Sequence, residues 1–382
     1  MLPPKISSRL PSLDGWRAVS IIMVLGWHVA MASPNAEKPF YAWLFDGMLG
    51  VRFFFTISGF LITWLLLQEA EHSGRVDLQH FYIRRFLRIL PVYFTFILVL
   101  WGLQLFTPFK ETAMGWLGMV TFTRNYANGT IASGHFWSLA VEEQFYLVWP
   151  GLLVLMGKRS FRFKTAILTV PILAAPIFRL GTYLFYFEHQ HLFSGSGGIH
   201  LKPAGLENLF NGSSFFCNFD SLAFGCLSAI FLAGKRMVLT GLFPKKPALL
   251  FVAALLLVEV PHFTEFFHLP GLVRVLLITC GPTLQALGFS AFLLHSLLQP
   301  DWPGYRPLNW KWVGWLGMLS YSLYIWQQIF CFRVWAGPDV WKDFPDALWA
   351  WLWLVPALAV ACLSYYGLER PLFRLRSRFR NE

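Results

Sequence analysis

The chain has 382 residues, of which 56% are hydrophobic, 18% are aromatic and only 13% are charged. A soluble domain carries about 25% charged residues, so this composition excludes an ordinary soluble protein and predicts a polytopic membrane protein. The formal net charge of +11 would suggest nucleic acid binding in a soluble chain. In a membrane protein, the distribution of Lys and Arg between loops first indicates which loops are cytoplasmic.

Apolar segments along the chain predict an all-α fold of about ten transmembrane helices. With a cytoplasmic N-terminus, 21 of the 31 Lys and Arg residues fall on the cytoplasmic side and 5 in outer loops. This positive-inside bias places both termini in the cytoplasm and removes the need for a nucleic acid partner. The predicted spans, of which the seventh is short, are 13–33, 48–68, 89–107, 136–156, 165–186, 215–234, 248–260, 271–298, 312–335 and 347–369.

The spans leave room for one domain, residues 1–382, and no appended soluble domain is expected. Residues 371–382 form a basic cytoplasmic tail that we expect to lie near anionic lipid. The longest outer loops, 108–135 and 187–214, are expected to help choose a substrate. The cysteines lie in apolar segments without metal-ligand spacing, so neither a disulfide nor a metal site is predicted: Cys217, Cys226, Cys280, Cys331 and Cys362.

The first predicted helix carries two unusual polar residues, Arg17 and His28. Eleven residues at 100° each make about three whole turns, so both side chains share one face, roughly 16 Å apart along the axis. Ionisable groups inside a membrane are functional candidates by default. Two other interpretations stay open: His28 hydrogen-bonds a neighbouring helix while Arg17 reaches the interface, or Lys5 and Arg9 open a cleaved signal peptide.

A cluster of arginines stands immediately before the third predicted span. Arg85 and Arg88 are three residues apart and share a helix face, with Arg84 beside them. The cluster is either an ordinary positive-inside signal or an anion site, because the arginine fork matches phosphate oxygens in geometry and charge. Its position on the cytoplasmic side, with Arg17, suits a phosphorylated cytoplasmic donor.

The fourth span opens with two adjacent carboxylates. Ser138 and Glu142 are four residues apart on one face, whereas Glu143 points about 100° away. Carboxylates in a span need a cavity or partner cations. They are either structural or suited to proton transfer and to orienting an imidazole.

Several later positions carry weaker signals. Asp220 is either an interfacial helix cap or a site residue, and residues 320–327 form either an aromatic belt or a sugar-stacking surface. Glu369 and Arg370 read as a helix-end pair. Ser58 in the second span is explained by close helix packing.

These residues stand in an order that resembles the acyltransferase 3 family of membrane proteins, which includes O-antigen and exopolysaccharide O-acetylases. Each motif is weak alone, but five in order are specific. Two positions depart from the family pattern: Gln327 stands where many members have His, and Asn218 where an Arg often precedes the Asp motif. The matching blocks are Leu13–Arg17 with His28, Gly50–Phe60, Arg85–Tyr93, Trp137–Tyr146 and Glu369–Pro371.

The resemblance implies transfer of an acyl group, usually acetyl, from cytoplasmic acyl-CoA to a hydroxyl of a glycan or glycolipid across a bacterial cytoplasmic membrane. His28 is then the general base or a transient acyl carrier, and Glu142 or Glu143 orients it. The expected donor-binding residues are Arg17, Arg85 and Arg88, and the other expected site-lining residues are Asp14, Ser138 and Tyr93.

Two other classes of function stay open at this stage. The first is a proton-coupled transporter or flippase, with His28, Glu142 and Glu143 as a proton relay, although no inverted repeat is visible. The second is a membrane sensor or scaffold, although the chain shows no signalling domain. The acceptor, the acyl chain and the oligomeric state are not specified by the sequence.

Overall fold

The computed structural model describes residues 10, 12–32, 44–157, 159–188, 212–242, 247–266, 271–334 and 351–376. All regular elements in these segments are helical, and no strand occurs among them. The short elements are α5 (Ala113–Val120), two 3₁₀ turns (Ile131–Ser133 and Arg306–Asn309) and a π-helical segment (Tyr365–Glu369). The main helices are α1 (Leu13–Ala32), α3 (Gly47–Ser73), α4 (Leu78–Phe106), α6 (Phe136–Met156), α7 (Phe161–Glu188), α9 (Phe215–Leu242), α10 (Pro247–Phe266), α11 (Gly271–Leu298), α12 (Lys311–Cys331), α14 (Leu354–Ser364) and α15 (Arg370–Arg376).

Several of these helices are long and apolar enough to cross a bilayer. Within the described residues there are six: Gly47–Ser73, Leu78–Phe106, Ile131–Met156, Phe161–Phe185, Phe215–Gly234 and Gly271–Leu298. Helices α1 and α12 are not among them. The chain is therefore an all-helical integral membrane protein, as the composition predicted, while the count of ten spans and the cytoplasmic termini stay predictions.

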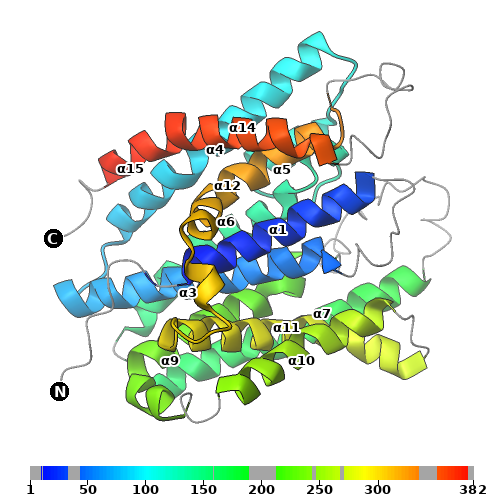
Figure 1. The fold of residues 1–382 in the computed structure, drawn as a ribbon. Coiled ribbons are helices and arrows are strands. Elements are labelled where there is room, and N and C mark those ends of the chain that lie inside the picture. Colours follow the sequence, from blue (N-terminus) through cyan, green and yellow to red (C-terminus); the bar gives the residue numbers. More distant parts are fainter. Residues whose placement is uncertain are drawn as a thin grey trace.

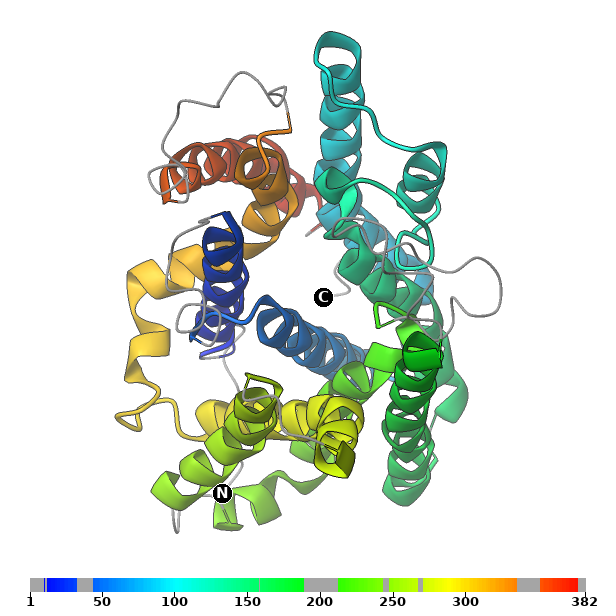
Figure 2. The ribbon, with the colours of Figure 1, turned by 90° about the vertical axis from the view of Figure 1, so that its right-hand side faces the viewer.

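The helices form one elongated bundle (Figure 1). Helix α1 packs against α3 and α12, and α3 packs in turn against α9. Farther out, α7 lies against α9, α10 against α11, and α14 against α12. Viewed along the bundle, α1 and α3 lie toward the middle, with the other helices around them (Figure 2). Residues on α1 and α3 are thus placed where a buried site would form.

Helix α3 approaches α9 closely because glycines face the contact from both sides. A Cβ atom built on Gly59 would fall inside van der Waals distance of the Leu222 carbonyl oxygen. One built on Gly225 would overlap the Thr56 carbonyl oxygen in the same way. Small residues allow such backbone contact between membrane helices, so this pair fixes how α3 sits in the bundle.

The α3 and α9 contact gives a stability prediction. Gly225→Ala is expected to lower the free energy of unfolding by about 1–3 kcal/mol, because the added methyl group pushes on the α3 backbone. Gly151→Ala in α6 is the matched control, since nothing lies within 4 Å of a Cβ built there. Thermal unfolding of the purified variants in detergent measures both. Equal melting temperatures for the two variants would contradict the assigned packing.

Helix α4 differs from its predicted span, 89–107, by beginning at Leu78. The Asp77 side chain caps it by accepting a hydrogen bond from the His80 backbone N–H at 3.0 Å, which holds the pKa of the Asp77 carboxyl below its usual range. The arginines from Arg84 to Arg88 therefore lie inside the helix, about two to three turns from its start. Hydropathy marks only the apolar part of a helix, so this polar first section was missed.

Other boundaries also differ from the predicted spans. The seventh helix, α10, runs over Pro247–Phe266 and is longer than the predicted 248–260. The last predicted span, 347–369, is divided into α14 and the π-helical segment, with α15 following directly. Most of the predicted loop 187–214 and the end of the predicted tail 371–382 lie outside the described residues.

Candidate active site

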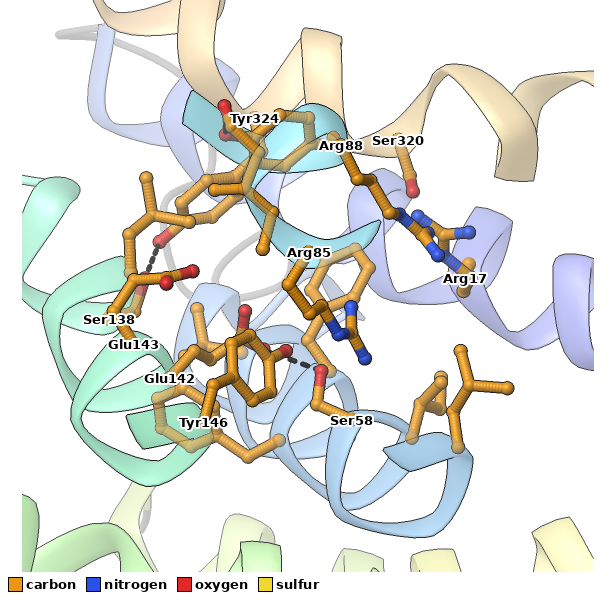
Figure 3. Close-up of a pocket in the computed structure, with 18 residues that line it drawn as sticks. Arg17, Ser58, Arg85, Arg88, Ser138, Glu142, Glu143, Tyr146, Ser320 and Tyr324 are labelled. Carbon is orange, nitrogen blue, oxygen red and sulfur yellow. Dashed lines mark hydrogen bonds between the residues drawn. The ribbon is translucent and has the colours of Figure 1, made fainter. Parts of the chain in front are cut away.

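A cavity opens between α1, α3, α4, α6 and α12 (Figure 3). Residues from chain segments more than 300 positions apart line it, from Arg17 on α1 to Tyr324 on α12. Six of the nine residues expected in the site line this cavity: Arg17, Arg85, Arg88, Ser138, Glu142 and Glu143. The cavity thus combines guanidinium groups and carboxylates inside the helix bundle.

Three arginines form the cationic part of the cavity. Arg85 and Arg88 are the eighth and eleventh residues of α4, and Arg17 is the fifth residue of α1. The Arg85 guanidinium lies over the Tyr146 ring, 4.5 Å from its centroid, a cation–π contact. Within the described residues, no carboxylate lies at ion-pair distance from these three side chains. Their N–H groups are therefore available for an anion in the cavity.

Two carboxylates face the arginines from α6. Glu142 Oε1 accepts a hydrogen bond of 2.8 Å from Ser58 Oγ on α3, and Figure 3 shows this contact beside Tyr146 and Arg85. Arg85 interacts electrostatically with both glutamates across the cavity. A buried carboxylate needs such partners, and these hold Glu142 in one orientation.

Ser138 and Tyr324 lie at another part of the cavity wall. Their hydroxyl groups, Ser138 Oγ and Tyr324 Oη, are 2.5 Å apart. This contact joins α6 to α12, and Ser138 Oγ also donates to the His135 carbonyl oxygen at the start of α6, at 3.1 Å. The contact brings two polar groups to the cavity from different helices.

His28 does not line the cavity. Its side chain is buried, with 9% of its surface exposed, and its Nδ1 lies 2.9 Å from Gln327 Oε1 on α12. The Phe332 ring meets the imidazole edge-on, with centroids 5.7 Å apart. Gln327 follows Tyr324 by three residues, about 4.5 Å along α12, so His28 lies one helical turn beyond the Ser138 and Tyr324 wall.

Two further expected residues, Asp14 and Tyr93, also lie outside the cavity lining. The buried Tyr93 hydroxyl donates to the Met119 carbonyl oxygen at 2.7 Å, which anchors α4 to the short helix α5. Asp14 interacts electrostatically with Arg17. The structure therefore gives Tyr93 a hydrogen bond between α4 and α5, and leaves Asp14 near Arg17 but outside the cavity lining.

Glu369 was predicted from the sequence to form only a helix-end pair with Arg370, but the structure gives it a larger role near the cavity. It is buried in the π-helical segment, with 3% of its surface exposed, and accepts a hydrogen bond from Ser322 Oγ. It interacts electrostatically with both Arg17 and Arg88. π-Helical turns occur frequently at functional sites, and here the turn places a carboxylate behind two cavity arginines.

Tyr146 and Ser58 are further cavity residues that the sequence interpretation missed. Tyr146 follows Glu142 by four residues, as Glu142 follows Ser138, so extending that spacing by one step would have found it. Ser58 had an adequate packing explanation and no chemical pattern around it. Asp220, a weaker candidate, lies elsewhere and pairs with Arg179 at 2.5 Å.

Comparison with known proteins identifies the family of the chain and several relatives. A family model described as an acyltransferase domain, Acyl_transf_3, matches residues 10–366. A Bacillus subtilis protein named as a candidate peptidoglycan O-acetyltransferase, YrhL, is 25% identical over 95% of this chain and 55% of its own length. The peptidoglycan O-acetyltransferase OatA of Listeria monocytogenes is 31% identical over 39% of this chain and 25% of its own length.

The O-acetyltransferase OatA of Staphylococcus aureus is 38% identical over 37% of this chain and 24% of its own length. The chain thus spans about half or less of the length of these relatives. No solved structure matches it. The family model covers nearly all of the chain, including each helix that lines the cavity, and the chain therefore belongs to the acyltransferase 3 family.

Proposed function

We propose that this protein is a membrane O-acetyltransferase that moves an acetyl group from cytoplasmic acetyl-CoA to a hydroxyl of a glycan or glycolipid on the far side of the bacterial cytoplasmic membrane. One observation carries the proposal: the cavity joins three arginines without carboxylate partners at ion-pair distance, among the described residues, to the two α6 carboxylates. Relatives named as peptidoglycan O-acetyltransferases support a glycan acceptor.

The arginines suit the phosphate groups of coenzyme A. Arginine binds phosphate oxygens through paired N–H groups and keeps its charge when desolvated. Arg17, Arg85 and Arg88 lie in the N-terminal parts of α1 and α4, the helix ends that the charge bias predicts to be cytoplasmic. The pantetheine arm would then extend along the cavity toward Ser138 and Tyr324.

In this proposal His28, which lies one helical turn beyond that end of the cavity, acts on the acceptor hydroxyl. With Gln327 Oε1 accepting the Nδ1 hydrogen, Nε2 carries the free lone pair and serves as the base. Nε2 takes the hydroxyl proton, the acceptor oxygen bonds to the thioester carbonyl carbon, and the C–S bond breaks. The imidazolium then returns the proton to the coenzyme A thiolate.

The second route is transient acetylation of His28 itself, followed by transfer to the acceptor. Rapid quenching into denaturant at neutral pH, which limits hydrolysis of an acetylimidazole, of a reaction with labelled acetyl-CoA and no acceptor distinguishes the two routes. Label retained on the wild-type protein and absent from His28→Ala identifies the covalent route. Label absent from both identifies the general-base route.

The function is tested with purified protein in proteoliposomes, supplied with acetyl-CoA on one side and cell-wall glycan fragments on the other. We expect glycan fragments that are heavier by one acetyl mass, detected by mass spectrometry. A changed distribution of unmodified glycan across the membrane, without added acetyl groups, would instead support a transporter and reject the proposal.

Gln327 gives a prediction of its own as a positioning residue. Gln327→Ala is expected to lower kcat about tenfold, because one hydrogen bond worth about 1–1.5 kcal/mol no longer fixes the His28 tautomer and ring orientation. The KM for acetyl-CoA should stay unchanged, and Gln327→Glu should restore part of kcat, since its carboxylate also accepts the Nδ1 hydrogen. Steady-state kinetics measure both. A merely structural role would lower the amount of folded protein and leave kcat per folded molecule unchanged.

A further inference from the structure

A second cavity lies beside the first and takes no part in the mechanism above. It is lined from five helices, near the end of the bundle at which α3, α6 and α9 begin; Figure 2 views the bundle from this end. Its lining includes Arg52 on α3, Trp137 on α6, Arg179 on α7, Asn218 on α9 and Pro282 on α11.

Arg179 is a buried cation in the wall of this second cavity, and two of its guanidinium nitrogens have no hydrogen-bond acceptor among the described residues. Its side chain is 8% exposed, and Nη2 makes both of its hydrogen bonds, to Asp220 Oδ2 at 2.5 Å and to Thr283 Oγ1 at 2.7 Å. Thr283 donates its own hydrogen to the same Asp220 oxygen at 2.6 Å. Among the described residues, Arg179 Nε and Nη1 have no acceptor.

Arg52 adds a second guanidinium to the same cavity. Its Nη1 donates to Gln285 Oε1 at 2.5 Å, and its buried Nε has no acceptor within the part of the chain that the structure describes. The two arginines interact electrostatically with like charge. The carboxylate of Asp46, the other acid near Arg52, is engaged with the backbone of α3 and with His262.

Packing alone does not account for this pair of cations. A buried ion pair such as Arg179 with Asp220 is often no more stable than apolar side chains of equal volume, and a second guanidinium beside it adds repulsion. Buried donors that lack acceptors are costly in a finished fold. Both arginine side chains line the cavity, and guanidinium groups match the oxygens of a carboxylate or a phosphate ester.

The two cavities adjoin through α3 and α6. Trp137 lines the second cavity and its neighbour Ser138 lines the first. The Trp137 ring meets Phe55 edge-on, with centroids 6.0 Å apart, and Phe55 lines the first cavity. Along α3, Arg52 and Ser58 are six residues apart, about 9 Å. A ligand the size of one or two sugar rings held at Arg52 would therefore reach toward the first cavity.

We infer that the second cavity binds an anionic group of the acceptor, a carboxylate or a phosphate ester, through the guanidinium groups of Arg52 and Arg179. The Trp137 ring offers an apolar face for the attached sugar. That the anion belongs to the acceptor rests on the proposed function, whereas anion binding in this cavity does not.

The test measures binding of three matched probes to full-length protein in nanodiscs: glucose, glucuronate and glucose 1-phosphate. Saturating coenzyme A is present to occupy the first cavity, and ligand-observed NMR reports each dissociation constant. We expect at least one charged sugar to bind at least tenfold more tightly than glucose. Preference for glucuronate identifies an acidic sugar as the source of the anion, and preference for glucose 1-phosphate identifies a phosphorylated glycan.

Variants then locate the binding site. Arg52→Gln should raise the dissociation constant of the charged sugar at least tenfold, whereas Arg85→Gln in the first cavity and the exposed Arg306→Gln should not. Arg179→Gln alone would leave the buried Asp220 carboxylate without its ion-pair partner. The double variant Arg179→Gln with Asp220→Asn is therefore used, and it too should weaken binding of the charged sugar. Equal binding of all three probes, or charged-sugar binding that is unaffected by Arg52→Gln, overturns the inference.

The same samples separate this inference from the proposed function. Coenzyme A binding to wild type is measured without sugar. If coenzyme A fails to bind while the charged sugar binds through Arg52, the donor assignment fails and the second cavity stands. If coenzyme A binds and the charged sugars bind no better than glucose, the inference fails and the donor assignment stands.

Discussion

Replacing His28 with alanine is expected to abolish acetyl transfer while the protein still folds and inserts in the membrane. A positioned general base contributes about 10²–10⁴-fold to a rate, so kcat should fall by at least 100-fold. The donor arginines are untouched by this change, so the dissociation constant for coenzyme A should match that of wild type. The measurements are kcat in proteoliposomes and coenzyme A binding to the purified variant.

A matched control separates the role of His28 from the general effect of removing an imidazole. His72 lies exposed in the last turn of α3, where its Nδ1 approaches the Gln68 carbonyl oxygen at 2.8 Å. His72→Ala should keep wild-type kcat. If His28→Ala also keeps it, then the imidazole is a packing element that bonds to α12, which is the alternative that the sequence left open, and the proposed mechanism fails.

The sequence predicted the helices well because their apolar length is a local property. The fourth span, for example, was predicted as 136–156 and observed as Phe136–Met156. The predicted helix boundaries were wrong where a helix continues beyond its apolar section. The Asp77 cap and the arginine-rich first turns of α4 are polar, so hydropathy placed the start of that helix eleven residues late.

Candidate site residues were predictable where charge alone made a position unusual. Arg85, Glu142 and Glu143 are hard to place against lipid, and the structure collects them around one cavity. Partners across helices were not predictable in this way. His28 and Gln327 are 299 positions apart, and nothing local to either residue specifies that α1 packs against α12.

Glu369 is a second residue whose partners on other helices could not be predicted from the local sequence. Beside Arg370 at a helix end it looked like a local pair, yet the π-helical turn rotates it inward to Ser322 and toward Arg17. The helical register of the preceding residues would not have predicted this direction. A residue's role in a membrane bundle thus depends on irregular turns that composition and spacing do not reveal.

Arg85→Gln is expected to weaken use of acetyl-CoA through the loss of a contact to donor phosphate. A hydrogen bond to a charged group contributes about 1.5–3 kcal/mol, so kcat/KM for acetyl-CoA should fall about 10–100-fold, mainly through KM. Arg84→Gln is the control on the adjacent residue: Arg84 pairs with Glu69 at 2.7 Å and does not line the cavity. Its kcat/KM should stay close to that of wild type.

A truncated donor assigns the effect of Arg85→Gln to phosphate. S-acetylpantetheine carries the same thioester as acetyl-CoA and no phosphate, so its kcat/KM should be low with wild type and nearly unchanged by Arg85→Gln. The discrimination between the two donors should therefore shrink by the same 10–100-fold that acetyl-CoA loses, because the contact that Arg85 makes is the contact that the truncated donor lacks. An equal fall for both donors would show that Arg85 acts on the reacting end, through Glu142 or Tyr146, and would move the donor phosphates away from this part of α4.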